Sequence, residues 1–320
     1  MAPRPVVLVA YPGAQLLDIA GPLEVFRGAA QLIPGSYVAD VVAREGVTTS
    51  SGLPLTPDGP LPDGEIDTLV VVGGPGVELA LADEELVGWL AGAARRSRRV
   101  ASVCTGALLL AHVGLLDGRR ATTHWVAARA LARRYPDVLV EEDRLYVRDG
   151  DVWTSGGVTS GMDLALALVE DDLGREVSLE LARWLVWYVR RPGGQSQFRG
   201  PLVPPPGGGR GVLGDVREWV LANLAADLRV EVLAERACMS PRNFARVFQR
   251  EFGMTPGAFV ERARVEAARR ELTGGADGVE VVAARCGFGT AETMRRAFHR
   301  QLGVGPTEYR RRFRPSLAAH

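Results

Sequence analysis

The carboxyl third of this chain contains an internal repeat. Residues 240–256 parallel residues 290–306 at an offset of 50 positions. In both copies a hydroxyl residue, Ser240 or Thr290, precedes a helical pattern, an aromatic stands eight residues later, and Gly-x-x-Pro closes the unit. A duplicated unit with helical periodicity restricts this part of the chain to two similar helical modules.

In each module, the sequence pattern predicts two helices joined by a short turn. Residues 230–237 predict a short helix, and Ser240 caps a second helix that has Pro241 at its first position. Residues 281–285 and the helix behind Thr290 repeat this arrangement. Residues 256–272 predict a connecting helix of about 25 Å. Such a spacer is long enough to place two helices in successive DNA major grooves, about 34 Å apart.

Polar side chains collect on the outer face of the second helix of each module. Phe244, Val247 and Phe248 take the inner face of the first. The outward side chains able to reach base edges or phosphates are Arg242, Asn243, Arg246 and Gln249 in the first module, and Glu292, Thr293, Arg295, Arg296, His299 and Arg300 in the second. A single exposed arginine is usually only solvated, so the prediction of double-stranded DNA as a partner rests on the cluster.

The zero net charge of the chain is a cancellation between its two parts. Residues 1–210 carry 20 Arg and 25 Asp or Glu, whereas residues 211–320 carry 18 Arg and 13 Asp or Glu. A basic carboxyl part suits a polyanionic partner.

The amino part predicts an α/β fold in which a parallel sheet is flanked by helices. Short apolar, β-branched runs predict buried strands at residues 6–10, 37–43, 68–72, 100–103 and 152–154. Helical patterns lie between and after them, at residues 22–30, 77–94, 106–113, 125–135, 160–173 and 176–189. We therefore predict a first domain over residues 1–190, a Pro/Gly-rich linker over 191–210, and an all-α domain with two helix-turn-helix units over 211–320.

Composition indicates a cytoplasmic protein without a membrane partner. Apolar runs fall short of the ~18 residues of a transmembrane helix, and residues 1–9 lack the long apolar stretch of a signal peptide. Cys104, Cys238 and Cys286 stand far apart with no metal-ligand spacing, so neither a disulfide framework nor a metal or other cofactor is expected.

Cys104 follows a predicted buried strand and precedes a helix that begins with Thr105 and Gly106. A sulfur exposed at a helix amino terminus has a lowered pKa, because the helix dipole and free N–H groups favour the thiolate. The alternative is a small buried cysteine at a strand end.

The carboxyl domain resembles the AraC/XylS family over roughly residues 212–313. The matching stretches include Leu-Ala-Glu-Arg-Ala-Cys-Met-Ser-Pro-Arg-Asn-Phe, Gly-Met-Thr-Pro and Phe-His-Arg-Gln-Leu-Gly-Val-Gly-Pro. The resemblance implies base readers at Arg242, Ala245, Arg246, Glu292, Thr293, Arg295 and Arg296. Ala245 departs from the longer polar residue often found there, so readout by the first helix is expected to depend on its two arginines.

The amino domain resembles the ThiJ/PfpI branch of the class I glutamine amidotransferase-like superfamily, with a flavodoxin-like sheet. The matching stretches include Asp-Ile-Ala-Gly-Pro from Asp18, Val-Val-Val-Gly-Gly-Pro-Gly ending at Gly76, and Cys-Thr-Gly-Ala from Cys104. The resemblance implies Cys104 as the elbow nucleophile with Asp18 close to its sulfur, backbone amides of Gly74 and Thr105 forming an oxyanion-type pocket, and His124 nearby.

Plainer structural roles remain open for these residues. Asp18 is also explained as a helix cap, and His124 as a packed histidine. Hydrolytic members of the superfamily carry a histidine directly after the cysteine, where this chain has Thr105, which disfavours protease or amidase chemistry.

The segment Arg-Pro-Gly-Gly-Gln-Ser-Gln-Phe, beginning at Arg191, resembles GlxA-type regulators, which join the same two domains in this order. The resemblance implies an AraC-family transcription regulator whose amino domain senses a small molecule or an oxidant. We expect a homodimer on operator DNA, with RNA polymerase as a further candidate partner. The alternatives are a cysteine-dependent enzyme, of the isonitrile hydratase or glyoxalase-like hydratase type, fused to a DNA-binding domain, or a purely structural amino domain.

Overall fold

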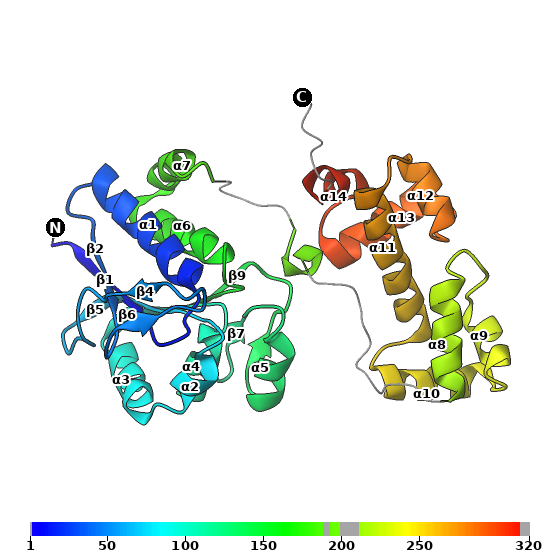
Figure 1. The fold of residues 1–320 in the computed structure, drawn as a ribbon, viewed down its shortest axis with the longest axis horizontal. Coiled ribbons are helices and arrows are strands. Elements are labelled where there is room, and N and C mark those ends of the chain that lie inside the picture. Colours follow the sequence, from blue (N-terminus) through cyan, green and yellow to red (C-terminus); the bar gives the residue numbers. More distant parts are fainter. Residues whose placement is uncertain (1, 188–192, 199–210, 314–320) are drawn as a thin grey trace. The chain divides into compact units, whose positions relative to one another are not determined.

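The computed structural model describes residues 2–187, 193–198 and 211–313 (Figure 1). The chain divides into two compact units, Met1–Gln195 and Ser196–His320. Of the predicted linker, only residues 193–198 are described, and Gln195–Phe198 form a short 3-10 helix, η1. The predicted helix over 176–189 is described as α7, Arg175–Trp184, and its last two positions lie outside the described residues.

A six-stranded sheet forms the centre of the amino unit, in the order β2-β1-β5-β6-β10-β9. The strands are β1 Arg4–Val9, β2 Tyr37–Val42, β5 Ile66–Val71, β6 Ser97–Val103, β9 Tyr146–Asp149 and β10 Val152–Ser155. All neighbours pair in parallel except β9 and β10. Short two-residue strands form two separate pairs: β3 Val47–Thr48 with β4 Pro54–Leu55, and β7 Arg120–Ala121 with β8 Leu139–Val140.

Helices cover both faces of this sheet (Figure 1). One face carries α1 Leu16–Leu32 and α6 Ser160–Leu173, with α7 packed against both. The other carries α3 Glu84–Arg95 and α4 Gly106–His112, with α2 Val77–Leu81 and α5 Ala128–Arg134 beside α4. The apolar runs of β1, β5 and β6 are therefore buried on both sides, which confirms the predicted fold class.

Three local features differ from the sequence prediction. The helix predicted over 77–94 is two helices, because the Asp83 side chain accepts a hydrogen bond from Leu86 N and caps α3 as a new start. Helix α1 begins six residues before Pro22 and contains that proline. Strand β9 has polar alternate positions and lies at a sheet edge, and the search for continuous apolar runs missed it.

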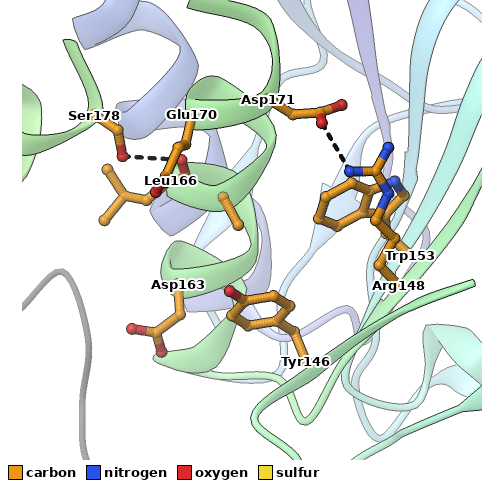
Figure 2. A pocket seen from close by; sticks show the side chains of 9 residues that line it. Tyr146, Arg148, Trp153, Asp163, Leu166, Glu170, Asp171 and Ser178 are labelled. Atoms are coloured by element: carbon orange, nitrogen blue, oxygen red, sulfur yellow. Dashed lines mark hydrogen bonds and ion pairs between the residues drawn. The ribbon is translucent and has the colours of Figure 1, made fainter. Parts of the chain in front are cut away.

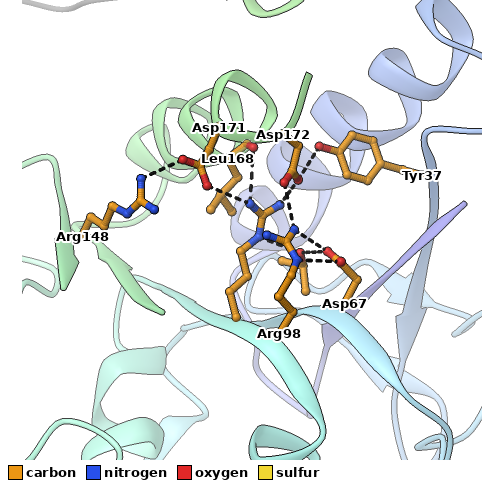
Figure 3. Close-up of polar contacts among 9 residues, drawn as sticks. Tyr37, Asp67, Arg98, Arg148, Leu168, Asp171 and Asp172 are labelled. Atoms are coloured by element: carbon orange, nitrogen blue, oxygen red, sulfur yellow. Dashed lines mark hydrogen bonds and ion pairs between the residues drawn. The ribbon is translucent and has the colours of Figure 1, made fainter. Parts of the chain in front are cut away.

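A network of ion pairs joins the amino ends of β5 and β6 to the end of α6 (Figure 3). Arg99, which is buried, pairs with Asp172 and donates to Thr68 Oγ1 at 2.8 Å. Tyr37 donates to the same Asp172 carboxylate at 2.7 Å, and Arg98 bridges Asp67 and Asp172. The network lies at the strand ends opposite Cys104, so we interpret it as structural.

The carboxyl unit is helical, as predicted. Its helices are α8 Val212–Ala222, α9 Val230–Arg236, α10 Pro241–Phe252, α11 Pro256–Gly274, α12 Val279–Arg285, α13 Ala291–Leu302 and α14 Pro306–Phe313. They enclose two separate apolar clusters, one around Phe244 and Phe248 and one around Met294 and Phe298. Helix α11 contributes Val260 to the first cluster and Val265 to the second, so one helix connects the two modules.

None of the helices described is long and apolar enough to cross a membrane.

Candidate effector site and nucleic-acid interface

Cys104 lies in the turn between β6 and α4. Its backbone has a φ of +57°, a left-handed conformation that costs a non-glycine residue about 1–3 kcal/mol and is found at functional sites. Close packing holds this turn in place, because a Cβ on Gly157 would lie 2.1 Å from the Cβ of Cys104. The side chain is buried, with 7% of the residue exposed.

Asp18 of α1 reaches this cysteine. Its carboxylate accepts hydrogen bonds from Val158 N at 2.7 Å, from Gly73 N at 3.2 Å and from the Cys104 thiol. Asp18 is fully buried, and burial raises its pKa to about 6 although all three hydrogen bonds lower it. Asp18 and the Cys104 thiol are therefore hydrogen-bonded to each other.

The ionisation of Cys104 differs from the sequence prediction. Burial raises the pKa of the thiol well above its usual range, and the charge of Asp18 raises it further. The Thr105 amide lowers the pKa, as expected at a helix amino terminus, but this effect is smaller than the other two. The thiol is therefore protonated at neutral pH and carries its hydrogen toward Asp18.

Of the two predicted oxyanion donors, the Thr105 amide interacts with the Cys104 thiol, whereas the Gly74 amide is occupied elsewhere. Gly74 N donates to Thr105 Oγ1 at 2.8 Å, so its amide is satisfied within the protein. The Thr105 hydroxyl in turn donates to Gly74 O at 3.1 Å. Sequence analysis missed Tyr11, a buried residue two positions after the end of β1, whose pKa is raised by burial and then by Asp18 and Cys104. Its place at the carboxyl end of a parallel strand was the available signal.

His124 is not joined to the sulfur. Its Nδ1 lies 3.4 Å from Val126 N and its ring packs on Trp125, with 5.4 Å between the ring centroids. Its pKa is lowered by burial. The neighbouring Thr123 contacts the backbone of Cys104, because its hydroxyl donates to the carbonyl Cys104 O at 2.7 Å. The group positioned to take the thiol proton is thus Asp18 rather than His124.

A separate cavity of about 490 Å³ lies between β9, β10, α6 and α7 (Figure 2). Tyr146, Arg148, Trp153, Asp163 and Glu170 are among its lining residues. The Arg148 guanidinium lies 4.5 Å from the Trp153 ring centroid and 2.7 Å from Asp171, so it occupies part of the aromatic surface. The cavity shares no lining residue with the Cys104 site.

In the carboxyl unit, α10 and α13 begin alike. Ser240 Oγ accepts from Asn243 N at 3.4 Å and Thr290 Oγ1 from Thr293 N at 3.1 Å, so both predicted caps are present. Gly253 and Gly303 end the two helices with a φ of +70°. The two helices thus share their caps as well as their sequence pattern.

On α10, the predicted readers Arg242, Arg246 and Gln249 are exposed, while Asn243 and Ala245 are half-buried. Arg246 donates to Asn243 Oδ1 at 2.9 Å. The inner face is filled by Phe244 and Phe248, both fully buried. None of these five residues is buried.

On α13, one carboxylate forms ion pairs with two of the arginines that were predicted to contact bases. Glu292, which is exposed, pairs with Arg295 at 2.7 Å and with Arg296 at 2.8 Å, and these arginines lower its pKa to about 2. Thr293 and His299 are also exposed. Arg300, predicted to face outward, pairs with Glu261 of α11 and is less available for DNA.

These two units define a class: a DNA-binding transcription regulator with an α/β sensing domain and an AraC-type pair of helix-turn-helix units. Residues 4–171 match the model of the DJ-1/PfpI family, and residues 233–312 match that of a helix-turn-helix domain. The chain belongs to the DJ-1/PfpI family and, with its helix-turn-helix domain, to the HTH-type transcriptional regulators.

Similar proteins carry the same combination. An HTH-type transcriptional regulator of Mycobacterium tuberculosis is 37% identical over 267 residues, covering 79% of this chain and 97% of that protein. The regulator GlxA of Rhizobium meliloti is 28% identical over 67% of this chain and 65% of its own. The amino unit alone resembles an isonitrile hydratase of Pseudomonas putida, 37% identical over 57% of this chain and 77% of that enzyme. Among solved structures, a THiJ/PfpI family protein from Pseudomonas syringae covers 74% of this chain and 90% of its own, with a TM-score of 0.54 and 26% identity.

Proposed function

We propose that this regulator controls transcription in response to a small molecule that binds beside Cys104, and that α10 and α13 read the operator. The observation that carries the proposal is the buried Asp18–Cys104 pair in the same chain as two similarly capped helices with exposed polar faces. A protonated thiol beside a carboxylate suits recognition or capture of a polar or electrophilic ligand better than direct oxidation, which needs thiolate.

The operator readers are proposed to be Arg242, Asn243, Ala245, Arg246 and Gln249 on α10, and Glu292, Thr293, Arg295, Arg296 and His299 on α13. A homodimer would present four helix-turn-helix units to a pair of half-sites. RNA polymerase is proposed as the further partner, and the cytoplasm as the place of action.

The first experiment is selection of bound DNA from a random pool with the full-length protein. We expect one enriched motif with two contact regions per half-site. Footprint width and sedimentation of the complex then give the number of chains bound. A pool with no enriched sequence would overturn the operator proposal.

The second experiment repeats the operator-binding assay against a panel of small metabolites, with Cys104→Ser and Cys238→Ser side by side. Cys238 is an exposed cysteine of the carboxyl unit and is the matched control. We expect Cys104→Ser to lose the response to the active metabolite and Cys238→Ser to keep it. An unchanged response in Cys104→Ser would remove Cys104 from the effector site.

The same panel tests the cavity between β9 and α6 as the competing effector site. Glu170→Gln removes a carboxylate from its wall without touching the Cys104 site. Loss of response in Glu170→Gln, with Cys104→Ser still responsive, would place the effector in that cavity.

A second candidate function is a cysteine-dependent hydratase. The identity to an isonitrile hydratase and the Asp18–Cys104 pair favour it, because Asp18 can accept the thiol proton as Sγ bonds to an electrophilic carbon. Incubation with an isonitrile and assay of the hydrated product tests it. In an enzyme, Cys104→Ser abolishes turnover while operator binding survives; a pure sensor shows no turnover in either form.

A further inference from the structure

Within the carboxyl unit, α11 runs between the two DNA-reading modules (Figure 1). The first module comprises α8 to α10 and the second α12 to α14. Their buried apolar clusters are separate, and α11 gives Val260 to the first and Val265 to the second. A long helix can bend along its length, so contacts across this junction determine how firmly the two modules are held relative to each other.

Arg264 lies on α11 between the residues that face the two clusters, and it is half-buried. Its Nε donates to Leu224 O at 3.0 Å and its Nη2 to Ala226 O at 3.3 Å. Leu224 and Ala226 belong to the loop between α8 and α9 and pack against the first apolar cluster. The planar guanidinium can serve both carbonyls at once, so Arg264 binds the middle of α11 to the first module.

The same loop contacts the second module. Gly287, in the turn between α12 and α13, has a φ of +80°, and a Cβ on it would lie 1.9 Å from Leu224 O and 2.9 Å from Arg264 Nε. The Leu224 carbonyl therefore occupies the space that a side chain at Gly287 would need. Thr290, which caps α13, follows three residues later. The start of α13 is thus positioned against a loop of the first module.

A weaker contact holds the other end of α13. Glu261 of α11, which directly follows Val260 of the first cluster, accepts hydrogen bonds from Arg300 at 2.5 Å and from Gln301 Nε2 at 3.1 Å. The Arg300 side chain is 57% exposed, and an exposed ion pair of this kind contributes little. The half-buried contact of Arg264 with the Leu224 and Gly287 backbones is therefore the main connection across the junction.

We propose that Arg264 is a specificity-determining residue of operator recognition. By holding the loop at Leu224 between itself and Gly287, it fixes the separation of α10 and α13, and with it the spacing of base pairs that the protein accepts. Arg264 acts through these two helices and is a positioning residue. The inference rests on the proposed reading of the operator by α10 and α13, whose spacing requirement it explains.

The first test measures binding of the full-length protein to the operator obtained by selection. One or two base pairs are inserted or removed between the two contact regions of a half-site. Each base pair turns one region by about 34° and moves it by about 3.4 Å relative to the other. The readout is the ratio of Kd at the altered spacing to Kd at the selected spacing, for wild type, Arg264→Met and Arg270→Met. Arg270 is an exposed arginine of α11 and is the matched control for the loss of one positive charge.

We expect a change of one base pair to weaken binding by wild type and by Arg270→Met at least about tenfold, and binding by Arg264→Met less than about threefold. A merely structural role of Arg264 would weaken binding at every spacing by the same factor and leave the ratio unchanged. Arg264→Lys keeps the charge and one donor group, and it should give an intermediate ratio. Equal ratios in wild type and both Arg264 variants, or a wild type indifferent to spacing, would overturn the inference.

The second test needs no DNA and remains informative whatever the selection yields. Spin labels are placed on the native Cys238, which is exposed in the turn between α9 and α10, and on Glu280→Cys at the exposed start of α12, while Cys104 and Cys286 are buried. We expect one narrow distribution of label distances in otherwise wild-type protein and in Arg270→Met, and a broader one in Arg264→Met and Arg264→Lys. Distributions unchanged by both Arg264 variants would overturn the inference.

The two tests separate this inference from the proposed function. A broader distance distribution in the Arg264 variants, together with a pool that yields no enriched sequence, rejects operator reading and with it the proposed consequence for spacing. An enriched operator whose spacing penalty and label distances do not depend on Arg264 rejects the role of this residue and leaves operator reading in place.

Discussion

At the scale of single residues, the amino unit places a carboxyl and a thiol together away from water. Neither group is held by an opposite charge among the causes of its pKa shift, and burial is the largest cause for both. The Asp18–Cys104 pair is therefore held by hydrogen bonds, and burial makes the thiol retain its proton.

The raised pKa of Asp18 predicts a specific dependence of stability on pH. Because the folded pKa of about 6 exceeds the ordinary value of 3.8, the folded state binds the proton more tightly, and this stabilisation is lost as the pH rises from about 4 to about 6. The change is about 3 kcal/mol in the free energy of unfolding. Urea denaturation of wild type and Asp18→Asn across this range measures it: the difference between the two should vary with pH, and parallel curves would contradict the prediction.

Two arginines are predicted to carry base readout. Arg246→Ala or Arg296→Ala should each remove about 1–3 kcal/mol of specific affinity, because a bidentate contact to a base is lost. Arg250, an exposed arginine of α10 outside the predicted set, is the control: Arg250→Ala should weaken all sequences equally. Titration of selected and scrambled DNA separates the two effects, and a footprint unchanged by both reader substitutions would reject the assignment.

At the scale of elements, α10 and α13 share a pattern but differ in charge. Helix α10 presents its arginines with no carboxylate bridging them among the described contacts, whereas Glu292 holds both Arg295 and Arg296 on α13. We predict that this pairing limits the contacts of α13 with phosphates of unrelated sequence, because both arginines are already paired.

Glu292→Gln should release these arginines. We expect tighter binding to non-specific DNA and a smaller ratio of specific to non-specific affinity. The slope of log affinity against log salt concentration should become steeper by about one to two. The pKa of about 2 means that Glu292 stays ionised from pH 5 to 8, so the wild-type behaviour should not change over that range. Glu251→Gln on α10 removes an equal charge from an exposed site, and an identical effect from it would show that net charge alone is responsible.

At the scale of the whole molecule, separate apolar clusters stabilise the two units. The amino cluster includes Leu8, Val71 and Leu109, and the carboxyl unit has two clusters of its own. The buried Arg99–Asp172 pair belongs to the amino unit, with 3% of each side chain exposed. Damage to that pair should therefore be confined to one unit.

Asp172→Ala leaves Arg99 buried with its main partner missing, which costs about 3–5 kcal/mol in the free energy of unfolding. Asp151→Ala removes the exposed partner of Arg119 and should cost about 0–1 kcal/mol. Urea denaturation of the full-length chain, with hydrogen exchange assigning each transition to its unit, measures both. Equal losses in the two variants, or a matching shift in the carboxyl unit, would contradict the prediction.

The sequence by itself determined the elements, because their causes are local. Apolar runs located β1, β2, β5, β6 and β10, and hydroxyl caps with helical periodicity located α10 and α13 within a repeat. The predicted helix over 77–94 is broken at Asp83, because a capping residue inside an apolar helical pattern does not interrupt the periodicity from which helices are predicted.

Only the tertiary structure decided the environment of Cys104 and the burial of Gln195. A helix amino terminus favours thiolate, but burial and Asp18 outweigh it, and those neighbours come from distant parts of the chain. Composition places Gln195 in a Pro/Gly-rich linker, yet its side-chain amide is bonded to Thr122, Thr123 and Arg144. Burial and hydrogen-bond partners belong to the assembled fold, so local sequence rules cannot specify them.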